Sequence, residues 1–221
     1  MDPTASFRPP GGSLRLRPLA EADAPFAADL HAHALPGGVM PLLGRGGLAA
    51  YYRGFARSPR AIAWLAERDA PVGMVVGAAD ADAHRRWVRR HQLASLALPV
   101  AGAVVAHPVR LGRFAKERLA GRLRASSSQR APSRGGSAAV LSHVAVSPPA
   151  RGTGAGAALV EAFTAAARRA GAERVCLVTP RDGGAAAFYD RLGWPRVTET
   201  VGWDGRRLVH FELALDPGGD G

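Results

Sequence analysis

Residues 144–163, VAVSPPARGTGAGAALVEAF, contain the most informative pattern in the chain. A short apolar run, a Pro-Pro turn, three closely spaced glycines and an amphipathic run predict a strand, a turn, a glycine-rich loop and a helix, in that order. Gly152, Gly154 and Gly156 permit a tight turn and leave the backbone N–H groups uncovered by side chains. These N–H groups are the unpaired donors at the positive end of the helix dipole, so the loop predicts a pyrophosphate site, to which Arg151 adds a fixed positive charge.

Two other phosphate-binding classes fit this loop less well. No Gly-Lys-Ser/Thr follows the glycines, which excludes a P-loop. Gly152, Gly154 and Ala157 satisfy a loose dinucleotide fingerprint, but the acidic residue that should end the next strand is missing, because Glu173 precedes the strand expected over residues 174–179. Only about 65 residues follow the motif, which is too few for the rest of a doubly wound domain. The sequence therefore disfavours a nicotinamide cofactor.

Three motifs, in order, resemble the GNAT superfamily of acyl-CoA-dependent N-acyltransferases. Residues 151–156, RGTGAG, are similar to the family's Q/R-x-x-G-x-G/A pyrophosphate loop. Residues 144–146, VAV, resemble the strand whose backbone hydrogen-bonds the pantetheine arm, and residues 186–194, AAFYDRLGW, resemble the A-x-x-Y-x-x-x-G-F/W helix and turn. The resemblance implies acetyl-CoA as the acyl donor, without a metal. The implied reaction transfers the acetyl group to a primary amine of an unidentified small molecule or peptide, by direct attack in a ternary complex.

The resemblance also assigns residues to the site. Tyr189 would place its hydroxyl near the sulfur of coenzyme A as the general acid. The backbone N–H groups of residues 144–146 would polarise the thioester carbonyl. The cofactor contacts implied are Val144, Ala145, Val146, Arg151, Gly152, Thr153, Gly154, Ala155 and Gly156.

The general base is less defined by the sequence. His143 lies directly before the cofactor strand and has an ordinary pKa near neutrality, which makes it the first candidate. Glu199 and His210, on the closing strands, are alternatives. Asp182 departs from the family pattern, since many members carry an asparagine there; an acid at this position suits the capping of the helix that follows.

The rest of the chain alternates between strand and helix patterns. Strands are expected over residues 14–17, 62–67, 72–78, 138–146, 174–179, 196–201 and 207–215, and helices over residues 21–34, 47–57, 184–192 and directly after the glycine loop. Gly171 is a natural stop for the helix after the loop, and Asp204-Gly205 predicts the turn of a terminal hairpin. Together with the resemblance, this predicts an α/β (α+β) fold with a mixed, mostly antiparallel central sheet flanked by helices. We expect one GNAT-like domain over residues 14–215, between disordered ends at residues 1–13 and 216–221.

One segment carries the whole net charge. Residues 83–136 hold twelve Arg or Lys and a single acid, Glu117, so their net charge of +11 equals that of the entire chain. The remaining residues are neutral, and we expect local amides and Arg151, rather than a broad positive field, to hold the cofactor. The segment predicts a basic helical insertion in the domain.

The insertion has three parts with different chemistry. Residues 84–91 are basic around a tryptophan, residues 93–106 form an uncharged, largely apolar run, and residues 110–124 are basic and helix-like, before a flexible linker that ends at residue 136. The apolar run is too short to span a bilayer, which takes about 20 residues. It fits a buried helix, a lid over the active site, or an interfacial segment through which residues 84–124 contact an anionic membrane. A solvated helical excursion and an acidic partner also remain open, whereas nucleic acid is disfavoured because no reading module is recognised.

Composition fits a soluble enzyme domain. The 221 residues suffice for one domain with a core, and a single cysteine, Cys176, excludes an intramolecular disulfide. Residues 1–13 lack the basic start and apolar run of a signal peptide, so the cytoplasm is the expected location, with the inner membrane surface as a peripheral alternative. The alternative function is a non-catalytic module that binds coenzyme A or a partner through the insertion. The oligomeric state stays open, a dimer included.

Overall fold

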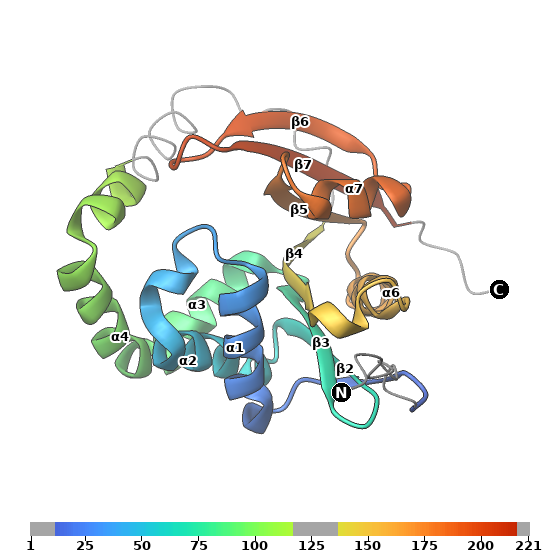
Figure 1. Ribbon diagram of the computed structural model, residues 1–221, viewed down its shortest axis with the longest axis horizontal. Helices are drawn as coiled ribbons and strands as arrows, with labels where there is room; N and C mark the ends of the chain where they lie inside the picture. The colour runs from blue at the N-terminus through green and yellow to red at the C-terminus, as the bar shows by residue number, and fades with distance from the viewer. Residues whose placement is uncertain (1–11, 117–136, 216–221) are drawn as a thin grey trace, which may run out of the picture.

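The computed structural model describes residues 12–116 and 137–215; the expectations for the chain ends beyond these ranges and for the linker of the insertion lie outside the described residues. Seven strands form one mixed, open sheet in the order β1-β2-β3-β4-β5-β7-β6 (Figure 1). The strands are β1 (Arg15–Pro18), β2 (Ala61–Glu67), β3 (Pro71–Ala78), β4 (Ala138–Val146), β5 (Arg174–Pro180), β6 (Arg196–Val201) and β7 (Arg207–Ala214). Every neighbouring pair is antiparallel except β4 with β5, which is parallel. The predicted fold class is confirmed.

Helices cover both faces of this sheet (Figure 1). They are η1 (Glu21–Asp23), α1 (Ala24–Ala34), η2 (Met40–Leu43), α2 (Gly44–Arg57), α3 (Ala81–His91), α4 (Leu93–Ala106), a further helix over Pro108–Lys116, η3 (Pro148–Ala150), α6 (Ala155–Arg169) and α7 (Gly184–Arg191). α1 and α2 pack on one face around Tyr52 and Leu65, and α6 and α7 pack on the other around Phe163 and Phe211. The strands and helices expected outside the insertion are all present, with ends within three residues of the expected ones, while the helix-like segment expected over residues 110–124 lies outside the described residues beyond Lys116.

The spacing of apolar residues after the glycine loop predicts a buried stripe of Leu159, Phe163, Ala166 and Ala170, and the structure buries a slightly different one. Leu159 and Phe163 are fully buried as predicted, but Ala170 is exposed because the helix ends at Arg169. Val160 and Ala167 take the remaining buried positions, as expected for a continuous helical face. The next residue after Ala170, Gly171, has a φ of 79°, which confirms it as the stop of this helix.

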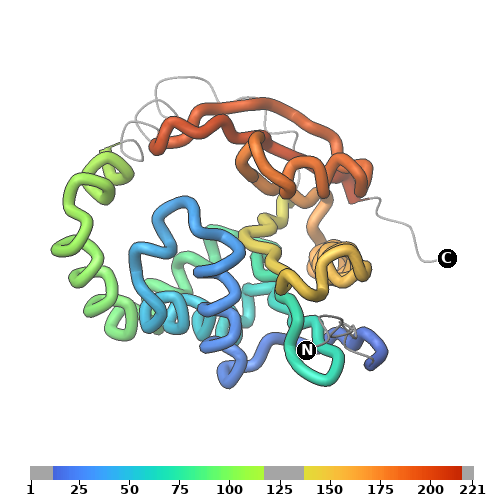
Figure 2. The backbone as a smooth tube through the Cα atoms, viewed as in Figure 1, coloured from blue at the N-terminus to red at the C-terminus, as the bar shows by residue number. Residues whose placement is uncertain are grey.

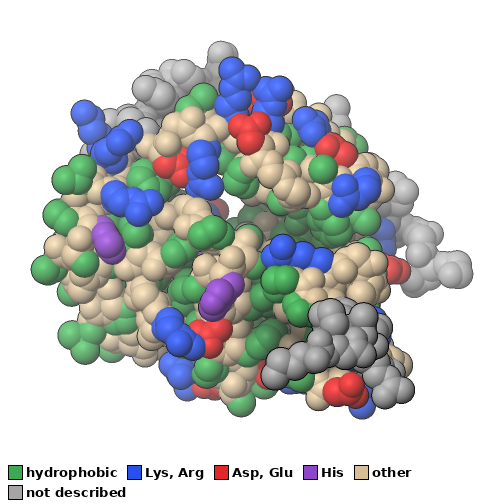
Figure 3. Space-filling view, viewed as in Figure 1, with side chains coloured by type: hydrophobic (Ala, Val, Ile, Leu, Met, Phe, Trp, Pro, Cys, Tyr) green, Lys and Arg blue, Asp and Glu red, His purple; other side chains and the backbone are tan. Residues whose placement is uncertain are grey.

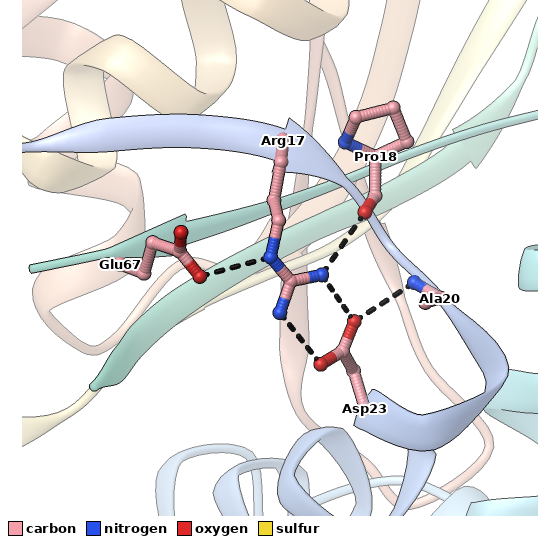
Figure 4. Close-up of polar contacts among 5 residues, drawn as sticks. All are labelled: Arg17, Pro18, Ala20, Asp23 and Glu67. Carbon is pink, nitrogen blue, oxygen red and sulfur yellow. Dashed lines mark hydrogen bonds and ion pairs between the residues drawn. The ribbon is translucent and has the colours of Figure 1, made fainter. Parts of the chain in front are cut away.

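A cluster around Arg17 ties the edge of the sheet to the start of α1 (Figure 4). The Nε of Arg17 donates to Glu67 on β2 at 2.8 Å, and its two terminal nitrogens donate to the Asp23 carboxylate at 2.6 and 2.8 Å. Asp23 also accepts the N–H of Ala20 at 2.8 Å. These bonds keep the pKa of the Asp23 carboxyl below its usual range. The cluster therefore fixes where α1 leaves the sheet.

The insertion runs along the outer side of α2 (Figure 2). α4 packs on α2 and on η2, and the following helix brings the ring of Phe114 to 5.8 Å from that of Trp203, in the turn between β6 and β7. α4 is not the buried helix that its composition allows, because Ala103 is its only buried residue. None of the described helices is by itself long and apolar enough to cross a membrane; α4 and the helix after it pass the length and composition test only together, across a bend of 107°.

Candidate functional site

The site begins where β4 and β5 separate. Their parallel pairing covers residues 138–140 of β4 and 174–176 of β5, and no further pairs join the two strands in the described chain. A cavity of about 560 Å³ opens at this point, lined by Leu141 to Val144 of β4 and Leu177 to Pro180 of β5. Figure 3 shows a hollow between the two halves of the molecule. The divergence of two neighbouring strands thus opens the sheet at its centre.

Two loops far apart in the sequence form other walls of this cavity. One is the loop from Ala34 to Met40, between α1 and η2, and the other is the turn between β6 and β7. The loops are in contact, since a Cβ added to Gly37 would lie 2.2 Å from a terminal nitrogen of Arg206. Arg206 in turn forms an ion pair with Asp204 at 2.5 Å. The sequence analysis did not assign either loop to the site; the paired glycines at 37 and 38 are the only local signal.

The glycine loop forms a cradle of free N–H groups at the end of β4. Gly152 and Gly154 have φ values of 76° and 85°, the left-handed region that favours glycine. The first hydrogen bond of α6 runs from the Ala158 N–H to the Gly154 carbonyl at 3.0 Å, so the N–H groups of residues 152–157 have no backbone acceptor among the described residues. The exposed Arg151 lies beside them and donates from Nε to the Val146 carbonyl at 3.2 Å. This arrangement fits the pyrophosphate of an acyl-CoA.

The strand that leads to the loop also has free backbone groups. The Ser147 N–H donates to the Val72 carbonyl of β3 at 2.8 Å. Hydrogen-bonding direction alternates along a strand, so the backbone groups of Ala145 also face β3. Those of Val144 and Val146 face the gap left by β5. Of the three strand residues in the expected cofactor set, Val144 therefore offers a backbone donor and an acceptor to a ligand in the gap, and Val146 offers its N–H, since its carbonyl accepts from Arg151.

A β-bulge sets the direction of His143. Val76 of β3 pairs with His143 and Gly77 pairs with Leu141, so Ser142 is an extra residue in β4. Without it, strict alternation would place His143 on the same face as Leu141, toward α6. The bulge instead turns the imidazole toward α1 and α2, where it lines the cavity.

His143 belongs to a cluster of two histidines and two tyrosines. Its Nε2 lies 3.1 Å from the Tyr51 hydroxyl, and Nδ1 of His31 lies 2.7 Å from the Tyr52 hydroxyl. Burial, with a smaller contribution from His31, lowers the pKa of His143 to about 3, and burial lowers that of His31 to about 4. Burial also raises the pKa of both tyrosines. All four groups are neutral at pH 7, and apart from His143 the sequence analysis did not place them in the site.

Tyr189 lies on α7 and lines the cavity from the opposite side. Its ring is buried against Trp194 and Phe211, with centroids 5.5 Å away in both cases. Burial raises the pKa of its hydroxyl, which therefore stays protonated at neutral pH. Within the described residues the hydroxyl has no hydrogen-bond partner. The side chain is packed between Trp194 and Phe211 and has a proton to donate.

The other candidates lie in different surroundings. Glu199 pairs with Arg181 at 3.2 Å, and the ring of His210 lies 2.9 Å from the Thr200 hydroxyl; neither residue lines the cavity. Asp182 does line the cavity, but it does not cap α7 as expected. The cap position is Gly183, with no side-chain hydrogen bond, so Asp182 stands one residue too early. In the described part of the chain, no three His, Cys, Asp or Glu residues gather to hold a metal.

The comparisons with known proteins agree with this geometry. The sequence matches the acetyltransferase (GNAT) family over residues 41–194, well over half of the chain. The chain therefore belongs to the GNAT acetyltransferase family and is an acyltransferase. No curated protein sequence matches it significantly.

Solved structures share its fold at low sequence identity. The Escherichia coli ribosomal-protein-S18-alanine N-acetyltransferase is 13% identical, with a TM-score of 0.57 over 94% of this chain and 97% of that one. Arabidopsis thaliana NAA60, solved in complex with acetyl-CoA, is 12% identical, with a TM-score of 0.58 over 92% and 99% of the two chains. Ard1 from Thermoplasma volcanium is 14% identical, with a TM-score of 0.55 over 91% and 97%. At these identities the likeness concerns the fold.

Proposed function

We propose that this protein is an N-acetyltransferase that transfers the acetyl group of acetyl-CoA to a primary amine, by direct attack in a ternary complex. The observation that carries the proposal is the separation of β4 from β5, with the glycine loop at the end of β4 and a cavity between the strands. Such a gap accepts an extended thioester arm with its phosphates on the loop. The similar fold of NAA60, solved with acetyl-CoA, supports this assignment.

The donor half of the site uses the residues that the sequence analysis named. Arg151 and the N–H groups from Gly152 through Gly156 bind the pyrophosphate, with Thr153 holding the loop through its hydroxyl bond to the Ala150 carbonyl at 2.8 Å. Val144 and Val146 hydrogen-bond the pantetheine arm, and the Val144 N–H polarises the thioester carbonyl. The rest of the domain is neutral, so these local contacts carry the affinity.

The chemistry needs one proton acceptor and one proton donor. The amine nitrogen forms a bond to the acetyl carbon, and the bond from that carbon to sulfur breaks. His143 is neutral and accepts the proton that the amine releases; since its charged form is costly to bury, it passes this proton on to solvent in the cavity that it lines. Tyr189 donates its proton to the departing sulfur and regains a proton from solvent in the cavity after the thiol leaves.

The acceptor half favours a basic amine. Asp182 lines the cavity and forms no ion pair within the described residues. A carboxylate in this position attracts an ammonium group to the cavity before the amine loses its proton. The contact between Gly37 and Arg206 brings two loops of the cavity wall together and narrows the space through which the acceptor enters. Both features suit an amine at the end of a chain, on a peptide or a small molecule.

Two measurements test the proposal together. The first is a thermal-shift and calorimetric titration with acetyl-CoA and with longer acyl-CoAs, in which tighter ligands should stabilise the folded protein more at the same concentration. The second is thiol release from acetyl-CoA with a panel of peptide N-termini, polyamines and amino sugars. Binding with turnover of at least one amine supports the proposal, and binding without turnover favours the non-catalytic module. No binding of any acyl-CoA would contradict it.

A further inference from the structure

The outer side of α4 is apolar and exposed. Leu98 and Val105 are each 82% exposed, and we define the α4 surface as these two residues with Leu93, Val100 and Val104. Figure 3 shows hydrophobic side chains along the left edge of the molecule, where α4 runs. Soluble proteins seldom expose a contiguous apolar patch unless something binds to it.

The α4 surface is not a core face left uncovered. α4 already has an inner face, on which Ala103 is buried and Pro99 meets Gly47 of α2 so closely that a Cβ on Gly47 would lie 2.8 Å from it. Leu98 and Val105, seven residues apart, point away from that contact. A helix that only covers α2 would carry polar residues on its outer side. The outer side therefore serves a second contact.

Basic residues flank this surface at both ends. Arg86, Arg89 and Arg90 lie on α3, and Arg110, Arg113 and Lys116 lie on the helix after α4, all of them exposed. Residues 83–116 contain no acid. In the described chain none of these six side chains forms an ion pair, whereas Arg85 is paired with Asp82. An apolar helix between unpaired cations has the charge pattern of an anionic lipid surface.

We propose that the α4 surface binds the surface of an anionic bilayer. α4 lies in the plane of the interface, with the side chains of Leu98 and Val105 in the boundary between headgroups and acyl chains and the flanking arginines on lipid phosphates. A helix of its length extends about 21 Å, short of the roughly 30 Å hydrocarbon core, so it lies on the membrane. A second copy of the chain fits less well, because a symmetric contact would bring the unpaired cations that flank the α4 surface of one copy close to those of the other.

Membrane contact at α4 also positions the site. α4 packs on η2, whose first residue, Met40, lines the cavity between β4 and β5. The bilayer would therefore lie one helix diameter, roughly 10 Å, from that wall of the cavity. An amine acceptor held at the membrane surface would reach the cavity without leaving the membrane.

Flotation of the full chain with vesicles tests the proposal. We expect binding to mixed phosphatidylcholine and phosphatidylglycerol vesicles, weak binding to pure phosphatidylcholine, and a decrease as salt screens the charges. The double variant Leu98→Glu and Val105→Glu should lose at least tenfold in affinity. The matched control, Val197→Glu with Val201→Glu on β6, changes two residues that are 60% and 69% exposed and should bind like the parent. Arg86→Ala and Arg90→Ala should each weaken binding about fivefold.

Three results would overturn the proposal. They are no binding to the mixed vesicles, equal loss in the β6 control, and a dimer in light scattering that the α4 double variant dissociates, which would assign the surface to a second copy. A thermal shift of the double variant with acetyl-CoA would show that this variant is folded. Because acetyl-CoA binding and vesicle binding are measured separately, the membrane proposal can fail while the proposed acetyltransferase activity holds, and the reverse.

Discussion

The hydroxyl oxygen of Tyr51 lies 3.1 Å from Nε2 of His143, and the His143 ring meets His31 edge-on with centroids 4.8 Å apart. The contact joins α2 to β4 at the wall of the cavity. Burial lowers the pKa of His143 to about 3 and that of His31 to about 4. Both histidines are therefore still neutral at pH values well below 6.5. A charge that either ring gains would therefore be poorly solvated, which costs the folded state.

This cost makes stability depend on pH. Both histidines have a folded pKa below the unfolded value of 6.5, so the unfolded chain binds protons between pH 6.5 and 4 that the folded chain does not. Stability is complete above pH 6.5 and falls as the pH drops, by about 1.4 kcal/mol per pH unit for each histidine. Thermal melts from pH 4 to 7.5 measure the slope. His143→Gln should remove one histidine's share of it, while the exposed His33→Gln serves as the control; an unchanged slope in His143→Gln would contradict the assignment.

Removal of the Tyr189 hydroxyl should slow the reaction without unfolding the protein. Tyr189→Phe keeps the ring contacts with Trp194 and Phe211 and removes only the proton that we assign to the leaving sulfur. We expect kcat to fall roughly 100-fold, with the acetyl-CoA affinity and the melting temperature unchanged. Steady-state thiol release and calorimetry measure both quantities. A variant with the parent kcat would exclude Tyr189 from the chemistry.

Arg151 should affect binding of the phosphates and nothing else. Arg151→Ala removes the exposed guanidinium beside the glycine loop, and we expect the Kd of acetyl-CoA to rise roughly tenfold, as is usual for a charged hydrogen bond. Acetyl-pantetheine lacks the pyrophosphate, so its weaker binding should be the same in both proteins. Arg168→Ala, at the other end of α6, is the matched control. Equal loss for both ligands would mean that Arg151 supports the loop rather than the phosphates.

Local chemistry explains what the sequence could predict. Gly171 ends α6 and Gly205 forms the β6–β7 turn, both with positive φ, because a backbone preference of this kind depends on the residue itself. The glycine loop, the strand before it and the α7 helix were predicted from residue patterns and from the order of three motifs that resemble the GNAT family.

Long-range pairing explains what the sequence could not predict. The direction of His143 depends on the extra residue Ser142, and that bulge exists only in the pairing of β4 with β3. Its partner Tyr51 is 92 residues away on α2. Residues 93–106 are apolar on every side of the helix that they form. Their sequence therefore has no periodicity that would show whether this helix is buried or, as in the structure, mostly exposed.

The cluster around Arg17 should stabilise the fold, and most strongly at neutral pH (Figure 4). Arg17→Gln removes the bonds to Asp23 and Glu67, and we expect a loss of about 1 kcal/mol, since the guanidinium is partly exposed and water screens the pairs. That corresponds to roughly 2–4 °C in the melting temperature. Because the folded pKa of Asp23 is lowered, its share of this stability is present above the unfolded value of 3.8 and disappears as the pH falls through the folded pKa. The difference between parent and variant should therefore shrink in acid, whereas Arg15→Gln, an exposed neighbour on β1 without an ion pair in the described residues, should match the parent at every pH.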